Sequence, residues 1–216
     1  HVPDIIVSDV MMPRMNGYKL CKTIKEDINI SHIPVILLTA RDDRQSQISG
    51  YKNGADGYLS KPFEVEMLME LIRNRLKNRE YTKKRYLNAG LIPTPEESTI
   101  SLTDETFLIK LNSIIQENIE NSNLGIQFIC QEVGLGRSSL YNKLKALTGM
   151  GANEYISKLR IEKAITLISG TDMPFSEIAE KTGFTTPSYF STAFKQYTGE
   201  TPSQYKERKK KGLADK

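Results

Sequence analysis

Residues 160–168 read RIEKAITLI and form the middle of the stretch that decides the fold. From position 153 to position 168, apolar residues recur at the three- and four-residue spacing of one helix face: Ile156, Leu159, Ala164, Ile165 and Ile168. This spacing predicts a helix over 153–168. One pattern of residues stands both before and after this helix, which indicates two copies of a single unit joined by it.

The two copies match at apolar, glycine and lysine positions. The offset from Gly134 to Gly183 is 49 residues, and the offset from Lys145 to Lys195 is 50 residues. Each glycine can supply the positive φ of a tight turn. Each copy therefore predicts a helix, a glycine turn and a second helix, over 126–133 and 137–148 and then over 174–182 and 187–198.

The second helix of each copy combines an apolar stripe with an acid-free polar face. The predicted inward residues are Leu140, Leu144 and Leu147, then Phe190, Ala193, Phe194 and Tyr197. Hydroxyl, amide and basic side chains suit DNA phosphates and base edges. Two helical hairpins packed for structure alone are the alternative, which the repetition disfavours. The candidate DNA-binding residues are Arg137, Ser138, Tyr141, Asn142 and Lys145, then Thr186, Ser188, Ser191, Thr192 and Lys195.

Residues 104–207 resemble the AraC-type DNA-binding domain. The resemblance rests on Ser138-Ser139-Leu140, Leu144-Lys145, Gly149, Tyr155-Ile156, Arg160 to Ala164, Gly183-Phe184, Ser188-Tyr189-Phe190, Phe194-Lys195, Gly199, Thr201-Pro202 and Tyr205. It implies two helix-turn-helix units that bind double-stranded DNA. This sequence departs from the family at Gly136, where a capping serine is usual, and at Thr192, where arginine is frequent.

Composition describes an ordinary soluble chain. The 216 residues are 38% hydrophobic and 26% charged, with a net charge of +4. Cys21 and Cys130 stand in apolar contexts, and no long apolar run or signal peptide is visible, so we expect a cytoplasmic protein. Seven bases and one acid fall within residues 73–85. This run can continue the helix that precedes it, and it is then either a solvated helix face or a DNA contact.

The first third of the chain alternates short apolar runs with helical patterns. Strands are predicted at 5–7, 34–39 and 56–60, and helices at 18–26, 42–53 and 65–78. Such alternation indicates a parallel sheet with right-handed crossovers. Asp9, Thr39 and Lys61 stand at the strand ends, where the carboxyl edge of a parallel sheet hosts chemistry. An acid, a hydroxyl and an ammonium group suit a phosphoryl group.

Residues 2–78 resemble the second part of a response-regulator receiver domain. The matching residues are Asp9, Met12-Pro13, Gly17, Leu38-Thr39-Ala40, Gly54-Ala55-Asp56-Gly57-Tyr58 and Lys61-Pro62-Phe63. The resemblance implies that Asp9 accepts a phosphoryl group from a histidine kinase. It assigns Thr39 and Tyr58 as switch residues and Lys61 as the phosphate-binding lysine. Mg²⁺ would be held by Asp9 and the backbone carbonyl of Met11.

A receiver has five strands, whereas three are predicted here, without the acidic pair that helps to hold Mg²⁺. We therefore expect an α/β receiver fragment, flavodoxin-like with its first two strands missing, whose Mg²⁺ site is incomplete and empty. An all-α domain with two helix-turn-helix units follows. The expected boundaries are 1–78 for the receiver part, 79–101 for a linker, 102–208 for the AraC-type domain, with a helix over 104–120, and 209–216 for a basic tail.

Together these features predict a sequence-specific transcription regulator of a two-component phosphorelay. The parent resembles hybrid histidine kinases and could be longer and anchored in the inner membrane; a homodimer is one possible assembly. One alternative is a phosphoaspartate enzyme, but no second acid lies near Asp9, and His1 and His32 are isolated. The chain itself is therefore predicted not to be an enzyme. The other alternative is an interaction module with a vestigial DNA face, which a DNA-binding assay would separate.

Overall fold

The structure is a computed structural model that describes residues 2–40, 54–89 and 101–214. It divides into two compact units. The first comprises His1–Ile109 with Ser138–Gly149, and the second comprises Lys110–Arg137 with Met150–Lys216. The expected helix over 42–53 and residues 90–100 of the expected linker lie outside the described residues.

A three-stranded parallel sheet forms the centre of the first unit. Its strands are β1 (Ile6–Asp9), β2 (Val35–Ala40) and β3 (Gly57–Lys61), in the order β1-β2-β3. Asp9 pairs with Leu38 and Leu38 with Leu59, so the carboxyl ends of the strands meet at one edge. The strand limits predicted from the sequence differ from these by at most two residues.

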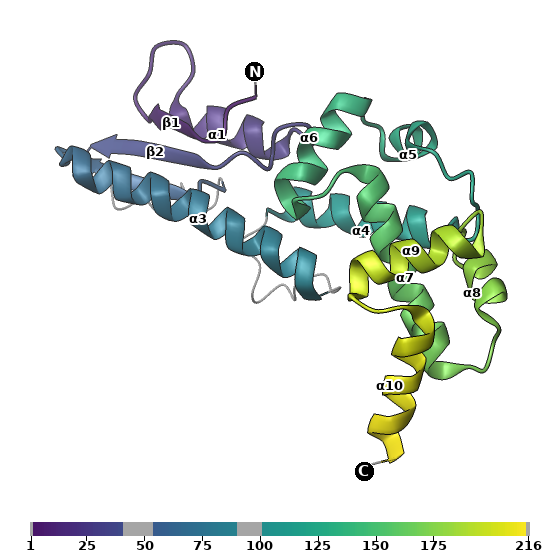
Figure 1. The fold of residues 1–216 in the computed structure, drawn as a ribbon. Coiled ribbons are helices and arrows are strands. Elements are labelled where there is room, and N and C mark those ends of the chain that lie inside the picture. Colours follow the sequence, from purple (N-terminus) through teal and green to yellow (C-terminus); the bar gives the residue numbers. More distant parts are fainter. Residues whose placement is uncertain (1, 41–53, 90–100, 215–216) are drawn as a thin grey trace. The chain divides into compact units, whose positions relative to one another are not determined.

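Helices α1 (Gly17–Glu26) and α3 (Val65–Ala89) lie on opposite faces of this sheet (Figure 1). Cys21 and Ile24 of α1 pack against Val35 and Leu37 of β2 in a buried core. Helix α3 does not end near position 78 as predicted but continues to Ala89. The basic run at 73–85 is thus helical, and the first half of the expected linker is part of α3.

The remaining elements are helices. Helix α4 (Leu102–Glu117) begins in the first unit and ends in the second, and α6 (Arg137–Thr148) belongs to the first unit from Ser138 onward. The second unit also holds α5 (Ile126–Val133), α7 (Ala152–Gly170), α8 (Phe175–Lys181), α9 (Pro187–Thr198) and α10 (Pro202–Ala214). Helices α5, α6 and α9 have the predicted limits, and α7 is one unbroken helix.

The core of the second unit joins α7, α8, α9 and α10. Phe194 stacks edge-on against Phe190, with ring centroids 5.7 Å apart, and against Tyr205 of α10 at 5.6 Å. Helix α10 had no counterpart among the predicted elements. Tyr197 was predicted to face inward, but it is 39% exposed, and its hydroxyl donates to the Glu162 carboxylate at 3.2 Å.

Both predicted turn glycines have left-handed backbones. Gly134 has φ 79° and Gly183 has φ 70°. The amide of Gly134 donates to the carbonyl of Cys130 at 2.9 Å, which closes the end of α5. Because a side chain is strained at such φ values, glycine suits the turn that follows each first helix.

Candidate phosphoryl and DNA-binding sites

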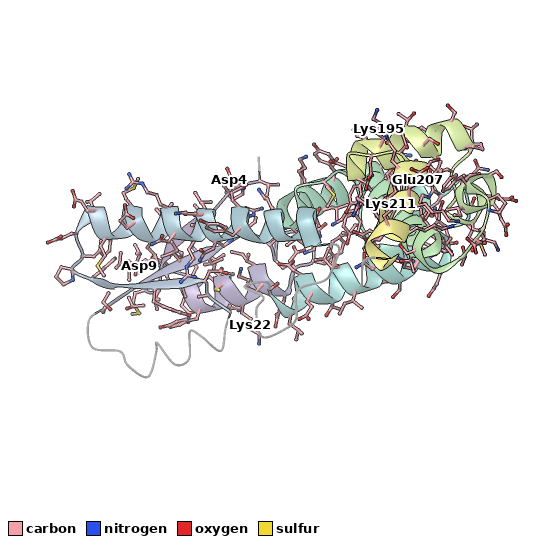
Figure 2. All side chains as sticks on the ribbon, turned by 60° about the horizontal axis from the view of Figure 1, so that its bottom comes forward. Asp4, Asp9, Lys22, Lys195, Glu207 and Lys211 are labelled. Atoms are coloured by element: carbon pink, nitrogen blue, oxygen red, sulfur yellow. The ribbon has the colours of Figure 1, made fainter. Side chains whose placement is uncertain are left out.

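The carboxyl edge of the sheet brings Asp9, Thr39 and Lys61 together, as the sequence predicted. Asp9 ends β1 and Lys61 ends β3, and the Lys61 ammonium group forms an ion pair with the Asp9 carboxylate (Figure 2 labels Asp9). The amide of Met11 donates to the same carboxylate at 3.3 Å. The hydrogen bond from Lys61 lowers the pKa of Asp9, so this carboxylate is ionised and available as a nucleophile.

Close packing holds the Asp9 loop in place. A Cβ on Gly17, the first residue of α1, would lie 2.4 Å from the carbonyl oxygen of Asp9. The amide of Gly17 donates to the carbonyl of Val10 at 2.9 Å. Helix α1 therefore begins directly against the loop that carries Asp9, and only glycine allows this approach.

Thr39 and Tyr58 occupy neighbouring strands behind this edge. Thr39 is 2% exposed, and its hydroxyl has no hydrogen-bond partner among the described residues. A buried hydroxyl without a partner is costly, so an oxygen acceptor arriving at this edge would be favoured. Tyr58 is half-buried against the core formed by α1 and β2.

Receiver domains normally bind Mg²⁺. The oxygen donors assigned to it from the sequence are the Asp9 carboxylate and the Met11 carbonyl. Within the described ranges, no cluster of three or more His, Cys, Asp or Glu residues is placed to hold a metal ion. Mg²⁺ takes six oxygen ligands in near-octahedral geometry, of which Asp9 and Met11 would supply two.

Helix α6 has a buried apolar face and an exposed polar face, as the sequence predicted. Its inner face buries Leu140, Leu144 and Leu147. Its outer face exposes all five candidate DNA-binding residues: Arg137, Ser138, Tyr141, Asn142 and Lys145. Gln127 of α5 accepts a long hydrogen bond of 3.5 Å from Arg137. The outer face carries bases, a hydroxyl, a phenol and an amide but no acid.

Helix α9 exposes Thr186, Ser188, Thr192 and Lys195, and leaves Ser191 half-buried. Two of its hydroxyl groups are already engaged. Thr186 caps the helix by accepting from the amide of Tyr189 at 3.2 Å, and Thr192 donates to the carbonyl of Ser188 at 3.1 Å. Lys195 projects from α9 (Figure 2). This face therefore offers methyl groups, the hydroxyl groups of Ser188 and Ser191 and one ammonium group.

Some contacts were not predicted from the sequence. Lys143 of α6 is fully buried, so only two of the three bases between Gly134 and Gly149 face outward. Arg160 of α7 donates to the carbonyl of Asn121 at 2.7 Å. The predicted inner and outer faces did not include Lys143, and nothing local identified Asp104, 39 residues away, as its partner.

Two family models match the chain. A response regulator receiver domain matches residues 1–73, and a helix-turn-helix domain matches residues 129–208. "Probable transcriptional regulator ycf29" from Pyropia yezoensis is 30% identical over 162 residues, which cover 70% of this chain and 73% of that protein. "Histidine kinase P4" from Formosa agariphila is 43% identical over 208 residues, which cover 96% of this chain but 15% of that protein.

Among solved structures, the C-terminal domain of AraT, a response regulator from Geobacillus stearothermophilus, is 31% identical with a TM-score of 0.45, covering 47% of this chain and 84% of that one. Among the described residues, no helix has both the length and the apolar character needed to cross a membrane. With a receiver match at one end and a helix-turn-helix match at the other, the chain belongs to the two-component response regulators that carry an AraC-type DNA-binding domain.

Proposed function

We propose that the chain binds double-stranded DNA through the outer faces of α6 and α9, under the control of phosphorylation at Asp9. One observation carries this proposal. Helix α6 buries Leu140, Leu144 and Leu147, and α9 buries Phe190 and Phe194. On the other face, both helices carry side chains of the types that bind phosphates and base edges, without any acid among the ten candidate residues.

Helix α6 is the better base-reading helix. Arg137 and Asn142 are exposed and planar, and each can form two parallel hydrogen bonds to one base edge. Lys145 is an exposed ammonium group suited to a phosphate, and Ser138 and Tyr141 supply further hydroxyl groups. We assign direct base reading to Asn142 and Arg137, and phosphate binding to Lys145.

Helix α9 contributes differently. Thr192 stands where arginine is frequent, and its hydroxyl is turned back onto the Ser188 carbonyl. Its methyl group can contact the methyl group of thymine. Lys195 suits a phosphate, and Ser188, Ser191 and Thr186 suit further phosphate or sugar contacts. Helix α9 thus provides affinity and a preference for thymine rather than strict base reading.

Asp9 is the proposed phosphoacceptor of the intact receiver, and the donor is a phosphohistidine of a kinase or kinase domain. A carboxylate oxygen of Asp9 attacks the phosphorus, the bond from phosphorus to the histidine nitrogen breaks, and the histidine keeps that electron pair. Lys61 neutralises the new phosphoryl charge, and the hydroxyl of Thr39 donates to a phosphoryl oxygen. In this function Asp9 holds the phosphoryl group as a signal, so the chain is a regulator rather than an enzyme.

The test is selection of DNA from a randomised pool of duplexes, followed by titration of the enriched duplex. The wild-type chain should enrich defined sequences and bind them more tightly than duplexes of random sequence. The double variant Asn142→Ala and Arg137→Ala should lose this preference while it keeps the folded circular-dichroism spectrum. A wild-type chain that enriches no sequence would contradict the proposal and favour an interaction module with a vestigial DNA face.

The chain spans 15% of the length of "Histidine kinase P4" and a third of "Response regulator Rre1" from Synechocystis. A parent protein with its own kinase domain, which would supply the phosphohistidine within one polypeptide, is therefore part of the proposal. Such a parent could place this chain at the inner side of a membrane, and dimerisation of the parent would present two DNA-binding domains.

A further inference from the structure

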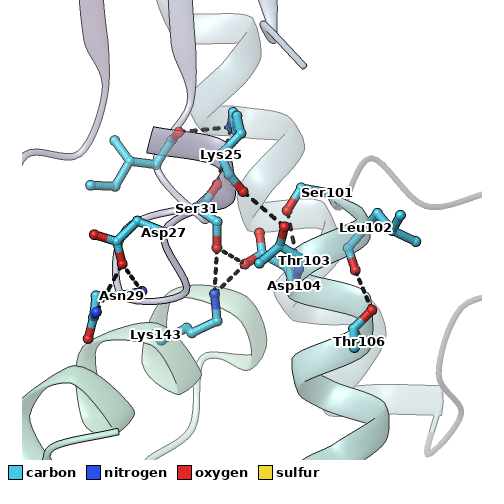
Figure 3. Close-up of polar contacts among 11 residues, drawn as sticks. Lys25, Asp27, Asn29, Ser31, Ser101, Leu102, Thr103, Asp104, Thr106 and Lys143 are labelled. Atoms are coloured by element: carbon cyan, nitrogen blue, oxygen red, sulfur yellow. Dashed lines mark hydrogen bonds and ion pairs between the residues drawn. The ribbon is translucent and has the colours of Figure 1, made fainter. Parts of the chain in front are cut away.

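Lys143 is a charged residue in the interior of the first unit. Its side chain is 0% exposed, although it lies on α6 between the exposed Asn142 and Lys145. The ammonium group forms an ion pair with Asp104 of α4 and donates to the hydroxyl of Ser31 at 2.7 Å (Figure 3). Burial lowers the pKa of Lys143, since desolvation disfavours the charged form.

The side chains of Lys143, Asp104 and Ser31 form a buried cluster in which each contacts the other two. Ser31 is fully buried and Asp104 is 3% exposed, and the Ser31 hydroxyl donates to the Asp104 carboxylate at 2.7 Å. The ring of Phe107 covers the ammonium group, with its centroid 5.1 Å away. A buried charge that loses a partner is strongly unfavourable, so these three side chains hold one another in a single arrangement.

This arrangement fixes the rotation of α6 about its own axis. Successive residues of a helix are separated by about 100°, so anchoring Lys143 inward determines where Asn142 and Lys145 point. A turn of α6 by one residue would move Asn142 toward the interior and leave a buried ammonium group without its partners. Together with the buried Leu140, Leu144 and Leu147, the cluster therefore fixes the outer face that the helix presents.

The third partner, Ser31, belongs to the receiver part of the chain. It ends the turn after α1, where its amide donates to the carbonyl of Asp27 at 2.8 Å. Helix α1 begins at Gly17, against the Asp9 loop, and its ten residues extend for about 15 Å. A second link lies beside the first, since the hydroxyl of Thr103 in α4 donates to the carbonyl of Lys25 in α1 at 2.9 Å.

We infer that Lys143 is a positioning residue for DNA reading by α6, and that Ser31 is the point at which the receiver acts on it. The inference rests on the proposed function and adds its route of regulation. One short helix connects the loop that carries Asp9 to the cluster that sets the orientation of Asn142. A displacement of the first turn of α1 would move Ser31. Through the contact of Ser31 with Lys143, it would change the orientation of the DNA-binding face of α6.

The test uses the duplex selected by the wild-type chain and a random-sequence duplex of equal length. The measured quantity is the ratio of the two dissociation constants. Ser31→Ala removes only the receiver partner and leaves the ion pair intact. Because the Lys143 ammonium group then keeps one of its two polar partners and α6 is held less firmly, the ratio should fall by roughly fivefold or more, the discrimination that one bidentate base contact provides. Affinity for the random duplex should stay unchanged, because Lys145 remains exposed.

Lys143→Met alone leaves the Asp104 carboxylate buried without its ion-pair partner, which is strongly destabilising. The double variant Lys143→Met with Asp104→Leu replaces the ion pair by apolar groups, which commonly preserves stability. It should unfold at a urea concentration near that of the wild type and still show the lower ratio. Ser203→Ala and Lys22→Met, on exposed surfaces of α10 and α1, serve as matched controls and should keep the wild-type ratio.

The outcomes are distinguishable. If the wild-type chain selects and binds a duplex but Ser31→Ala or the folded double variant keeps the wild-type ratio, the inference is wrong and the proposed function stands. If the wild-type chain selects no duplex, the proposed function itself fails. A lower ratio in both variants, with unchanged controls, supports the positioning of α6 by a contact from the receiver.

Discussion

The guanidinium group of Arg160 packs against Gly183, in the space that a side chain at position 183 would fill. A Cβ on Gly183 would stand 2.8 Å from a guanidinium nitrogen of Arg160 and 2.2 Å from the carbonyl oxygen of Ile119. The guanidinium group cannot easily withdraw, because it donates to the carbonyl of Asn121 and is itself buried. Gly134, the equivalent glycine of the first copy, has the same left-handed backbone but nothing within 4 Å of its Cβ position. The two turns share a conformation and differ in packing.

Alanine at the two glycines should therefore have unequal effects. Gly134→Ala should lower the free energy of unfolding by about 1 kcal/mol, the cost of a left-handed alanine. Gly183→Ala should lower it by about 3 kcal/mol, because overpacking against the Ile119 carbonyl and Arg160 adds to the same backbone cost. Urea denaturation of both variants measures the difference. Equal losses would show that the close packing around Gly183 relaxes without cost.

The repeat was predictable because its signals are local. Apolar spacing, turn glycines and the proline at the start of α9 each act within a few residues, so three helices of the repeat have the predicted limits. The strand ends at Asp9 and Lys61 followed from the same reasoning, since parallel strands must end at one edge.

Features that depend on distant partners were not predictable in this way. Lys143 reads as one more base on an acid-free helix, and only tertiary structure brings Asp104 and Ser31 to it. Tyr197 continues an apolar stripe in the sequence, yet its ring stays exposed because Glu162 of α7 holds its hydroxyl. Helix α3 runs past position 78 because nothing in the basic run stops a helix; the charges alone did not specify its end.

His32 should make stability depend on pH. Burial, with the nearby charges of Lys143 and Arg79, lowers its pKa from 6.5 to about 4. Above pH 6.5 the residue is neutral whether the chain is folded or unfolded. Between pH 6.5 and pH 4 the unfolded chain binds a proton that the folded chain does not, so stability should fall as the pH decreases, by about 3 kcal/mol at most.

The measurement is the free energy of urea unfolding from pH 7 to pH 4.5 for the wild type and for His32→Leu, which fills similar space without titrating. The difference between the two proteins should shift steadily in favour of His32→Leu as the pH decreases. A difference that does not vary with pH would mean that the His32 environment admits the protonated form.

The exposed lysines of the two outer faces should each contribute one phosphate contact. Lys145→Ala and Lys195→Ala should weaken binding to every duplex and reduce the slope of log K against log salt by about one unit each. Lys22→Ala, which removes an exposed lysine from α1, is the control and should leave the slope unchanged. Slopes that match the wild type in both helix variants would place the DNA-binding surface elsewhere.

We expect the methyl group of Thr192 to contact the C5 methyl group of a thymine in the selected duplex. Replacing individual thymines of the selected duplex by deoxyuridine removes only the C5 methyl group. At the positions that α9 contacts, this replacement should weaken binding of the wild-type chain severalfold, as expected for a lost apolar contact. Thr192→Ser lacks the side-chain methyl group and should respond less. An equal response of both proteins at every position would exclude a contact between the two methyl groups.

The last prediction concerns how one chain uses both copies. Helix α7 has 19 residues and is therefore about 28 Å long. With the width of a DNA-binding helix added, this length approaches the 34 Å turn of B-DNA. A single chain should then protect two major-groove segments about 10 base pairs apart in a footprint, without a second copy.

Ala164→Pro, in the buried middle of α7, should lower the stability of the helix by about 3 kcal/mol or more and uncouple the two protected segments. Ala152→Pro, at the first position of the same helix, should leave both segments protected, because proline is tolerated there. Protection of one segment per bound wild-type chain would mean that the two copies do not bind together.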